Sequence, residues 1–507
     1  MAAVSLRKAQ DPLMLALDIG SSASRARLYD AAGAPLRRTR HRTPHQIQSG
    51  PDGSAVLDPD LVLRNVSEVI DATLATGTYW NRIGAVAMDT FASSLVGVDA
   101  DGVALTPCLT YADSRPSAQV LALRAELDEP VVQQRTGCRI SASYLPAQLR
   151  WFYATNPDLA NRVARWLSLG EYIFARLLGQ HAASYSTAAW TGLLNRHTAC
   201  WDEAMIAASG ARIDQFSPLH DTTEPLDGSG SEAARRWPAL AEARWFPAVA
   251  DGFSSNVGSG ASDSSTLALA AGTSGALRVL VDGVPKQIPA GLWCYRVDRR
   301  RSLLGGALND AGRLALWLRT NLNLPQEDAA VDALLASPPA AGTPAVLPFL
   351  TGERSPGWAT SASAAFVDIT ATTRAPDLWR GAMEGLALRY GLIADQLASV
   401  APLATRVVAS GGVVETTPSW LQIVADVLGR PVARSEERNA TMWGTALIAL
   451  DVLAPDTPRP NPRTGDAVTP QPNHIPYYQE ALARQQDLYA RLIADEMGGQ
   501  WAVGSGQ

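Results

Sequence analysis

Apolar and polar positions along the chain follow two alternating periods. Short apolar runs, typical of buried strands, precede stretches in which apolar residues recur every three to four positions, as in amphipathic helices. In the first half the pattern predicts strands at residues 13–18, 26–29, 83–88 and 95–98, and helices at residues 60–75, 118–127 and 145–156. Residues 162–178 are predicted to be either a strand followed by a helix or a helical segment, and residues 221–231, rich in Thr, Gly and Ser, a surface loop. This alternation is typical of an α/β fold.

The second half repeats the alternation. It predicts strands at residues 267–271, 276–281 and 406–409, and helices at residues 312–322, 378–400, 419–428, 443–451 and 478–497. A proline-rich stretch, residues 455–472, reads as a linker before the last helix. In the long helix one face carries the apolar residues Met383, Leu386, Tyr390, Ile393 and Leu397. That stripe predicts a core-facing helix rather than a site.

Two segments that lie 252 residues apart read as copies of one device. Residues 15–30 and 267–282 share seven of sixteen ungapped positions, and each consists of an apolar strand, a small-residue turn and a second strand that ends in Asp. The turns are Gly20-Ser21-Ser22 and Gly272-Thr273-Ser274. Because glycine lets the backbone approach an anion closely, and the turn amides and hydroxyls can donate hydrogen bonds, each hairpin is suited to hold a phosphate.

The repeat predicts two duplicated α/β domains, 1–256 and 257–507, that close on a nucleotide from two sides. The copies differ at one informative position, where the first carries Asp18 and the second Ala270. A carboxylate can serve a metal ion and a methyl group cannot. Only the first copy is therefore expected to serve a metal.

Composition removes several other classes of protein. The chain has 507 residues, is 47% apolar and 18% charged, and carries a net charge of −6 without a basic arm, which argues against nucleic acid as a partner. No apolar run is long enough for a membrane span, and the N-terminus has no secretory apolar region, so we expect a cytoplasmic protein with its four cysteines reduced. The only lysines, Lys8 and Lys286, fit neither a P-loop nor a protein-kinase strand, and no Gly-x-Ser-x-Gly elbow is present.

Six segments occur in the order found in one known family. They are residues 17–25 with the first hairpin turn, 110–115 (Thr-Tyr-Ala-Asp-Ser-Arg), 251–255 (Asp-Gly-Phe-Ser-Ser), the second hairpin, 352–356 (Gly-Glu-Arg-Ser-Pro), and 410–412 (Ser-Gly-Gly) followed by Trp420 and residues 425–432. Together they resemble the FGGY carbohydrate kinases through nearly the whole chain. The resemblance implies two duplicated actin-like domains of the ribonuclease H-like, hexokinase type around a central cleft, with ATP and Mg²⁺ as cofactors.

The resemblance also assigns expected roles to residues of this chain. Asp251, at a strand end near the junction of the halves, would be the general base for the sugar hydroxyl, and Asp18 would serve Mg²⁺ through water. Asp113 and Arg115 would grip sugar hydroxyls, with Ser93 and Ser94 near the same sugar. The expected phosphate and nucleotide contacts are Gly20, Ser21, Ser22, Arg25, Gly272, Thr273, Ser274, Gly312, Gly411 and Gly412.

The resemblance implies a small open-chain sugar acid or sugar as the acceptor. Segments 110–115 and 352–358 look most like the gluconate kinase branch, with xylulose kinases as the closest rival. Two departures, Tyr111 in place of the usual tryptophan and the absence of Arg-Gly in residues 361–368, leave another aldonate, ketose or polyol open. A non-catalytic actin-fold ATPase is the alternative from another class, and Asp113, Arg115 and Asp251 argue against it. A homodimer stays open.

Overall fold

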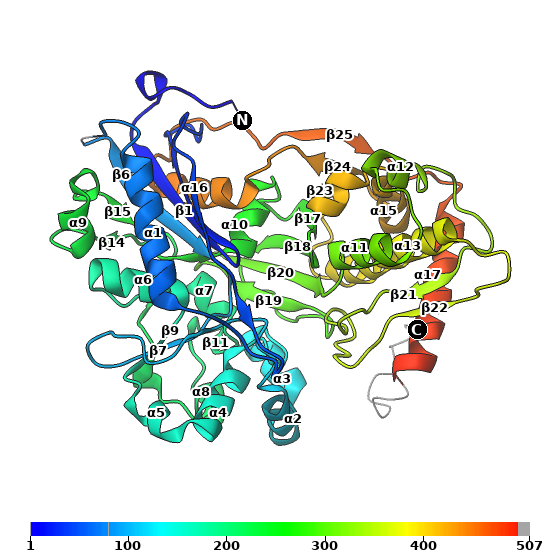
Figure 1. Cartoon of the computed structure of the whole chain (residues 1–507), viewed down its shortest axis with the longest axis horizontal. Coiled ribbons are helices and arrows are strands. Elements are labelled where there is room, and N and C mark those ends of the chain that lie inside the picture. Colours follow the sequence, from blue (N-terminus) through cyan, green and yellow to red (C-terminus); the bar gives the residue numbers. More distant parts are fainter. Residues whose placement is uncertain (1, 80, 495–507) are drawn as a thin grey trace.

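The computed structural model describes residues 2–79 and 81–494, which form two twisted sheets side by side (Figure 1). The first sheet has the strand order β14 (Leu226–Asp227), β15 (Arg244–Trp245), β6 (Ile83–Thr90), β1 (Leu13–Gly20), β2 (Ala23–Tyr29), β3 (His41–Pro44), with β16 (Val249–Ala250) also on β6. The second has the order β19 (Trp293–Arg296), β20 (Arg301–Leu308), β18 (Gly275–Asp282), β17 (Thr266–Ala271), β23 (Arg406–Ser410), β24 (Val432–Ser435), β25 (Thr464–Val468).

The predicted duplication is present in the topology. In the first sheet β1 and β2 form an antiparallel hairpin, β3 extends it, and β6 lies parallel to β1. In the second sheet β17 and β18 form the hairpin, β20 extends it, and β23 lies parallel to β17. The two phosphate-type turns therefore occupy equivalent places in two equivalent sheets.

Helices cover both sheets. Those of the first half are α1 (Pro59–Leu74), α2 (Ser117–Glu126), α3 (Glu129–Thr136), α4 (Leu145–Thr155), α5 (Pro157–Arg162), α6 (Leu169–Leu178), α7 (Tyr185–Ala189), α8 (Glu203–Ser209), α9 (Glu232–Arg236) and α10 (Asp251–Gly258). Those of the second half are α11 (Gly312–Asn321), α12 (Asp328–Ala333), α13 (Ala375–Ala398), α14 (Gly412–Thr416), α15 (Trp420–Leu428), α16 (Ala440–Leu453) and α17 (Ile475–Tyr489). Within the described residues no helix is long and apolar enough to cross a bilayer.

Short strands and single turns complete the chain. A small sheet consists of β4 (Gln48–Ser49), β5 (Ala55–Leu57) and β8 (Cys108–Leu109). The further strand pairs are β7 (Val96–Val98) with β9 (Arg165–Leu167), β10 (Ala183–Ser184) with β13 (Leu219–His220), β11 (Leu194–Asn195) with β12 (Cys200–Trp201), and β21 (Ala345–Leu347) with β22 (Ala365–Val367). Single helical turns lie at Leu6–Lys8, Ile213–Gln215, Pro238–Leu240 and Ala490–Ala494.

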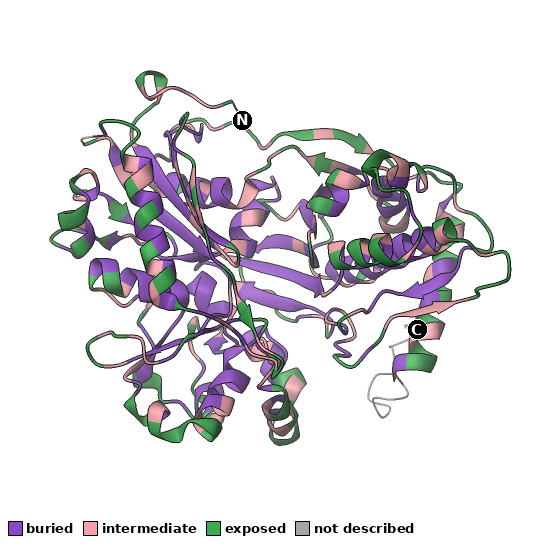
Figure 2. Ribbon diagram, viewed as in Figure 1, coloured by how far each residue is buried: buried purple, intermediate pink, exposed green. Residues whose placement is uncertain are grey.

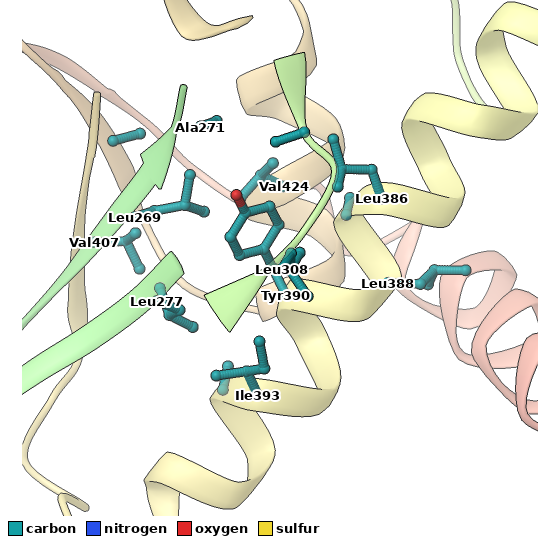
Figure 3. Packing of buried hydrophobic residues seen from close by; sticks show 14 of the residues in the cluster. Leu269, Ala271, Leu277, Leu308, Leu386, Leu388, Tyr390, Ile393, Val407 and Val424 are labelled. Atoms are coloured by element: carbon teal, nitrogen blue, oxygen red, sulfur yellow. The ribbon is translucent and has the colours of Figure 1, made fainter. Parts of the chain in front are cut away.

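The central strands are apolar on both faces because both faces are covered (Figure 2). On β1, Leu13, Leu15 and Leu17 belong to the core that includes α1 and α6, whereas Met14 and Ala16 pack with α16. In the second sheet the predicted stripe on α13 is fully buried, and Figure 3 shows the Tyr390 ring pointing from this helix toward the strands that carry Leu269 and Leu277. The Tyr390 hydroxyl donates to the Ala270 carbonyl, 2.8 Å away. The stripe is thus core, as predicted.

Two sequence expectations are wrong in part. The expected linker 455–472 contains β25, which adds an antiparallel strand to the edge of the second sheet, and the expected loop 221–231 contains the two-residue strand β14. Both are edge strands, most of whose residues are exposed or half-buried, so they carry little of the apolar signal that reveals a strand. The last helix begins at Ile475, and residues 495–497 of its predicted range lie outside the described residues.

Helix α16 crosses back from the second half and packs against the first sheet and α10 (Figure 1). The crossing depends on two glycines. A Cβ on Gly258 would lie 1.8 Å from the Ala440 carbonyl oxygen, and a Cβ on Gly444 would lie 1.8 Å from that of Ser254. The two backbones touch here, so any larger residue must separate the helices.

We therefore expect Gly444→Ala to lower the free energy of unfolding by about 1–3 kcal/mol, because a methyl group overpacks this backbone contact. The measurement is the first thermal or urea transition followed by circular dichroism. Gly465→Ala in β25 is the matched control, since its Cβ would approach no atom closer than 3.9 Å. Equal stability of the two variants would contradict a close-packed crossing.

Candidate active site

The first hairpin turn carries the predicted metal residue. Asp18 lies opposite Arg25 in the β1–β2 ladder, and Arg25 Nη1 donates to Asp18 Oδ2 at 3.0 Å. Burial raises the pKa of Asp18, and the Arg25 guanidinium opposes that rise. His45, which the sequence did not single out, places its Nε2 2.7 Å from the Gly20 carbonyl oxygen. Arg25 is thus held on Asp18, and the turn is braced from outside the hairpin.

Asp89 is a second carboxylate at this edge, and sequence reasoning missed it. It lies at the end of β6, directly beside Asp18 on one side and Val249 on the other. It is completely buried; Oδ2 accepts from the Thr445 hydroxyl at 2.5 Å, and Oδ1 has no partner among the described residues. Burial first, and then the nearby Asp18, raise the pKa of Asp89 well above its usual range. The polar Asp89-Thr90 at the end of an apolar run was the signal available in the sequence.

Asp251 occupies the first position of α10, immediately after β16. The N-cap is Ala250, and no side chain caps the helix, so Asp251 is not a capping aspartate. Burial raises its pKa to about 6; the Arg278 guanidinium lowers it and Asp18 raises it. Since neighbouring strands β1, β6 and β16 carry Asp18, Asp89 and the lead-in to Asp251, the sheet brings three carboxylates to one edge. Asp251 is poised to exchange a proton near neutral pH.

Magnesium ions keep much of their water and bind through few protein carboxylates. The described residues contain no cluster of three or more His, Cys, Asp or Glu side chains that could hold a metal. A single partly buried carboxylate at the phosphate turn, with the buried and unpartnered Oδ1 of Asp89 on the neighbouring strand, fits a hydrated Mg²⁺ carried by nucleotide phosphates. Asp18 is the residue that would serve it.

The second hairpin gathers several of the predicted nucleotide residues. The Gly272 carbonyl accepts from the Gly312 amide at 2.7 Å, and a Cβ on Gly312 would lie 2.6 Å from that carbonyl oxygen. Gly411 has φ 107°, and its Cβ would lie 2.8 Å from the Gly272 amide nitrogen. Thr273 and Ser274 are exposed, and a Cβ on Gly412 would meet no atom within 4 Å. The glycines allow close backbone approach, and they leave an open surface around the turn.

The predicted sugar residues lie deeper than expected. The Asp113 side chain is 0% exposed; Oδ2 accepts from the Ala55 amide, and Arg115 donates to both carboxylate oxygens. The Arg115 guanidinium also lies 4.3 Å from the centroid of a Trp151 ring. In this structure Asp113 and Arg115 therefore bond chiefly to each other and to neighbouring protein groups. Their contact with a sugar stays a prediction.

The two predicted serines also have protein partners. Ser93 donates to the Trp190 carbonyl at 2.7 Å, and Ser94 accepts from the Leu169 amide at 3.0 Å. Ser93 has φ 58°, a left-handed conformation that is uncommon outside glycine. Both hydroxyls are buried and shape the strand end, and their contact with substrate stays a prediction.

Tyr111, one of the two departures from the family pattern, lies where the elements of the site meet. Its ring packs edge-on against Phe91, with 6.1 Å between centroids, and remains 42% exposed. Burial and the Asp251 carboxylate raise the pKa of its hydroxyl, whereas a hydrogen bond with Ser21 and the guanidinium of Arg354 lower it. The Tyr111 hydroxyl thus interacts with Ser21 of the first phosphate turn, with Asp251 of the first domain and with Arg354 of the second.

These features define a class of protein: a phosphotransferase in which two duplicated domains each present a phosphate turn near a proton-accepting carboxylate. Comparison with known proteins specifies the class. The N-terminal domain of the FGGY family of carbohydrate kinases matches residues 13–258, and its C-terminal domain matches residues 267–450. The chain belongs to this family and is an ATP-dependent carbohydrate kinase with the two-domain arrangement of actin-like sugar kinases.

Several relatives cover most of the chain. The gluconokinase of Bacillus subtilis is 25% identical over 86% of this chain and 87% of its own length, and the glycerol kinase of Alkalilimnicola ehrlichii is 26% identical over 88% and 92%. Among solved structures, gluconate kinase from Lactobacillus acidophilus has a TM-score of 0.87 at 24% identity, covering 95% and 98% of the two chains. Xylulose kinase from Rhodospirillum rubrum has a TM-score of 0.86 at 25% identity, covering 95% and 99%.

The pKa of Asp251 gives a pH prediction. A base must be ionised to accept a proton, so kcat/KM should fall about tenfold per pH unit below a pKa of about 6. If the aspartate had its ordinary pKa, kcat/KM would stay unchanged until the pH fell to about 4. Initial rates between pH 5 and 8 in the presence of excess Mg-ATP measure this limb, and a flat profile from pH 5 to 7 would contradict it.

The asymmetry of the hairpins gives a second prediction. Asp18→Ala should lower Mg²⁺-dependent turnover by about a hundredfold or more, because it removes the carboxylate beside the phosphates. Ala270→Asp, the reciprocal change on the second hairpin, should create no second productive metal site. Turnover titrated with Mg²⁺ in both variants measures the effect, and equal tolerance at the two positions would refute the assignment.

Proposed function

We propose that this kinase transfers the γ-phosphate of ATP to a hydroxyl of a small open-chain sugar acid or sugar, with gluconate as the leading acceptor. The observation that carries the proposal is the state of Asp251. This carboxylate begins α10 without capping it, has a pKa of about 6, and interacts with Asp18 of the first domain and Arg278 of the second. Gluconate is supported by the gluconokinases of Bacillus subtilis and Bacillus licheniformis, which are 25% and 26% identical to this chain over 86% of its length. Dependence on ATP supports a cytoplasmic location.

In this proposal Asp251 accepts the proton of the attacking hydroxyl while the turns Gly20–Ser22 and Gly272–Ser274 donate hydrogen bonds to the phosphates from the two sides. When bound, Mg²⁺ neutralises phosphate charge, and Asp18 serves it through water. Asp113 and Arg115 hold the acceptor side, near Ser93 and Ser94. The nucleotide lies along the glycine-rich surface formed by Gly312, Gly411 and Gly412, with Arg25 adding charge at the first turn.

A xylulose or other polyol kinase is the alternative, because xylulose kinase from Rhodospirillum rubrum and the glycerol kinases are as similar to this chain as the gluconokinases are. The family match argues against a non-catalytic ATPase.

A coupled ADP assay across gluconate, xylulose, ribulose and glycerol tests the proposal. We expect gluconate to stimulate ADP formation most, and Asp251→Asn to lower turnover by about two to four orders of magnitude because an amide accepts no proton. Since burial disfavours the ionised carboxylate, the Asn variant should unfold at the same or a higher temperature at pH 8 than the parent. Its folding and ATP binding are therefore the internal control.

Near-normal turnover in the folded Asn variant would remove Asp251 from the mechanism. If xylulose stimulates ADP formation and gluconate does not, the acceptor is a ketose. If no acceptor stimulates ADP formation, the transfer reaction itself is refuted.

A further inference from the structure

Two arginines of the second domain form no ion pair among the described residues, and the first of them, Arg278, acts on Asp251. Arg278 is on β18, and Arg354 is on the loop after β21. Within the described residues no carboxylate oxygen lies within 4 Å of either guanidinium, and Arg278 Nε is buried with no hydrogen-bond partner. Other arginines of the site are paired, for example Arg25, Arg115 and Arg313, whose partners are Asp18, Asp113 and Asp310. The two unpaired guanidiniums are the exception.

Arg278 reaches the first domain. It stands on the hairpin strand that returns from the second phosphate turn, and a Cβ placed on Gly252 would lie 3.6 Å from its Cζ. Gly252 directly follows the base, so the guanidinium lies against the first turn of α10. Asp251 raises the pKa of Arg278, and Arg354 lowers it. With a pKa of about 6, Asp251 is mostly ionised at neutral pH, and its single charge compensates at most one of the two guanidiniums.

Arg354 is presented by a rigid loop. Its neighbour Glu353 is buried and accepts from the Gly357 amide at 3.1 Å, from the Tyr489 hydroxyl at 2.6 Å and from Arg389. The Trp358 indole donates to the Gly291 carbonyl at 3.0 Å. The loop is thus fixed on both sides of Arg354, which leaves the direction of its side chain little freedom.

Two carboxylates, Asp310 and Glu353, line a pocket together with Arg354, and each is ion-paired with another arginine, Arg313 and Arg389. Arg354 has no such pair among the described residues. It acts on Tyr111, Tyr144 and Tyr295, and the hydroxyls of Tyr144 and Tyr295 lie 2.6 Å apart. The positive charge of Arg354 also lowers the pKa of Arg278. Half-buried positive charges that have no counter-ion cost free energy, and an anionic ligand removes that cost. Guanidiniums are the groups that best match a carboxylate.

We propose that Arg278 and Arg354 together bind the carboxylate of the acceptor, so that this kinase selects a sugar acid over a neutral sugar or polyol. The inference rests on the proposed function, because it places the acceptor beside Asp251. The hydroxyl of Tyr111, a residue that is 42% exposed, can then bond to the uncharged part of the acceptor. The turns at the ends of the two hairpins are expected to hold the phosphates. The two guanidiniums are therefore left for the acceptor.

The test compares an acid with its neutral counterpart. D-gluconate and D-glucitol have the same six carbons, and only the first carries a carboxylate. The parent protein should prefer gluconate in kcat/KM, and Arg278→Gln and Arg354→Gln should each lower that preference by about 10- to 100-fold, the range for loss of a charge-assisted hydrogen bond. Arg278→Lys should recover part of it, because it restores the charge without the fork of donors.

The ratio of the two acceptors separates recognition from catalysis. Removal of Arg278 also changes the pKa of Asp251, but that change affects both acceptors and cancels in the ratio. Arg300→Gln is the matched control, since it removes one arginine from the exposed turn between β19 and β20 and should leave the ratio unchanged. Turnover of glucitol or xylulose by the Gln variants shows that they are folded.

Calorimetry with a non-hydrolysable ATP analogue measures acceptor binding without turnover. If gluconate binds in an arginine-dependent way but yields no ADP, the carboxylate site stands and gluconate phosphorylation is refuted. If the parent binds gluconate no more tightly than glucitol, or if the Gln variants weaken both acceptors equally, as arginines devoted to phosphates would, the carboxylate site is overturned while the kinase remains.

Discussion

The contact between α10 and α16 is the constraint on which the site depends. At Gly258 and Gly444 the two backbones approach so closely that neither position accepts a Cβ. The contact ties a helix of the second half to the first sheet and fixes α10, whose first residue is Asp251. Thr445, one residue beyond the crossing, also donates to Asp89 and lies 2.8 Å from the Ser254 hydroxyl. The same contact therefore both joins the two halves and fixes the position of Asp251, the proposed base.

Electrostatics at the strand ends follow from that arrangement. Parallel strands bring Asp18, Asp89 and the approach to Asp251 to the same edge, where burial raises the pKa of all three carboxyls and the Asp18 carboxylate adds to the rise at Asp89 and Asp251. Arginines offset this: Arg25 comes from the same hairpin as Asp18, and Arg278 comes from the other domain. The pKa of Asp251, the proposed base, is consequently set in part by a residue that only the assembled junction places beside it.

Duplication supplied two similar hairpins, and the two have diverged in charge. The first keeps an Asp–Arg pair across its ladder. The second has Ala270 opposite Ala276 and sends its arginine, Arg278, toward the first domain instead. One scaffold thus carries a carboxylate at the turn on one side, where we propose a hydrated metal, and a positive charge on the other, which we propose faces the acceptor. Selectivity in such a kinase resides in the groups that the scaffold presents, since related folds serve several acceptors.

Periodicity and the internal repeat were sufficient to predict much of the fold from the sequence. Apolar strands buried on both faces and a helix with an apolar stripe have strong local signals, so β1, β2, β6, β17, β18 and α13 were predicted close to their observed bounds. The edge strands β14 and β25 were missed, because exposed pairs form through backbone hydrogen bonds that leave no mark on side-chain pattern. The gathering of Gly272, Gly312 and Gly411 follows from motifs that the sequence already contained.

The sequence by itself determined the repeat, the family and the chemical types at the site, because these depend on residues close together along the chain. Only the tertiary structure decided that Asp89 lies between the other two carboxylates, that the buried Asp113 bonds to the Ala55 amide, and that Arg278 and Arg354 form no ion pair among the described residues. Those facts depend on distances between residues far apart in sequence. The physical reason is that burial and Coulomb interactions are set by the packed neighbours of a group, and local sequence does not specify which neighbours those are.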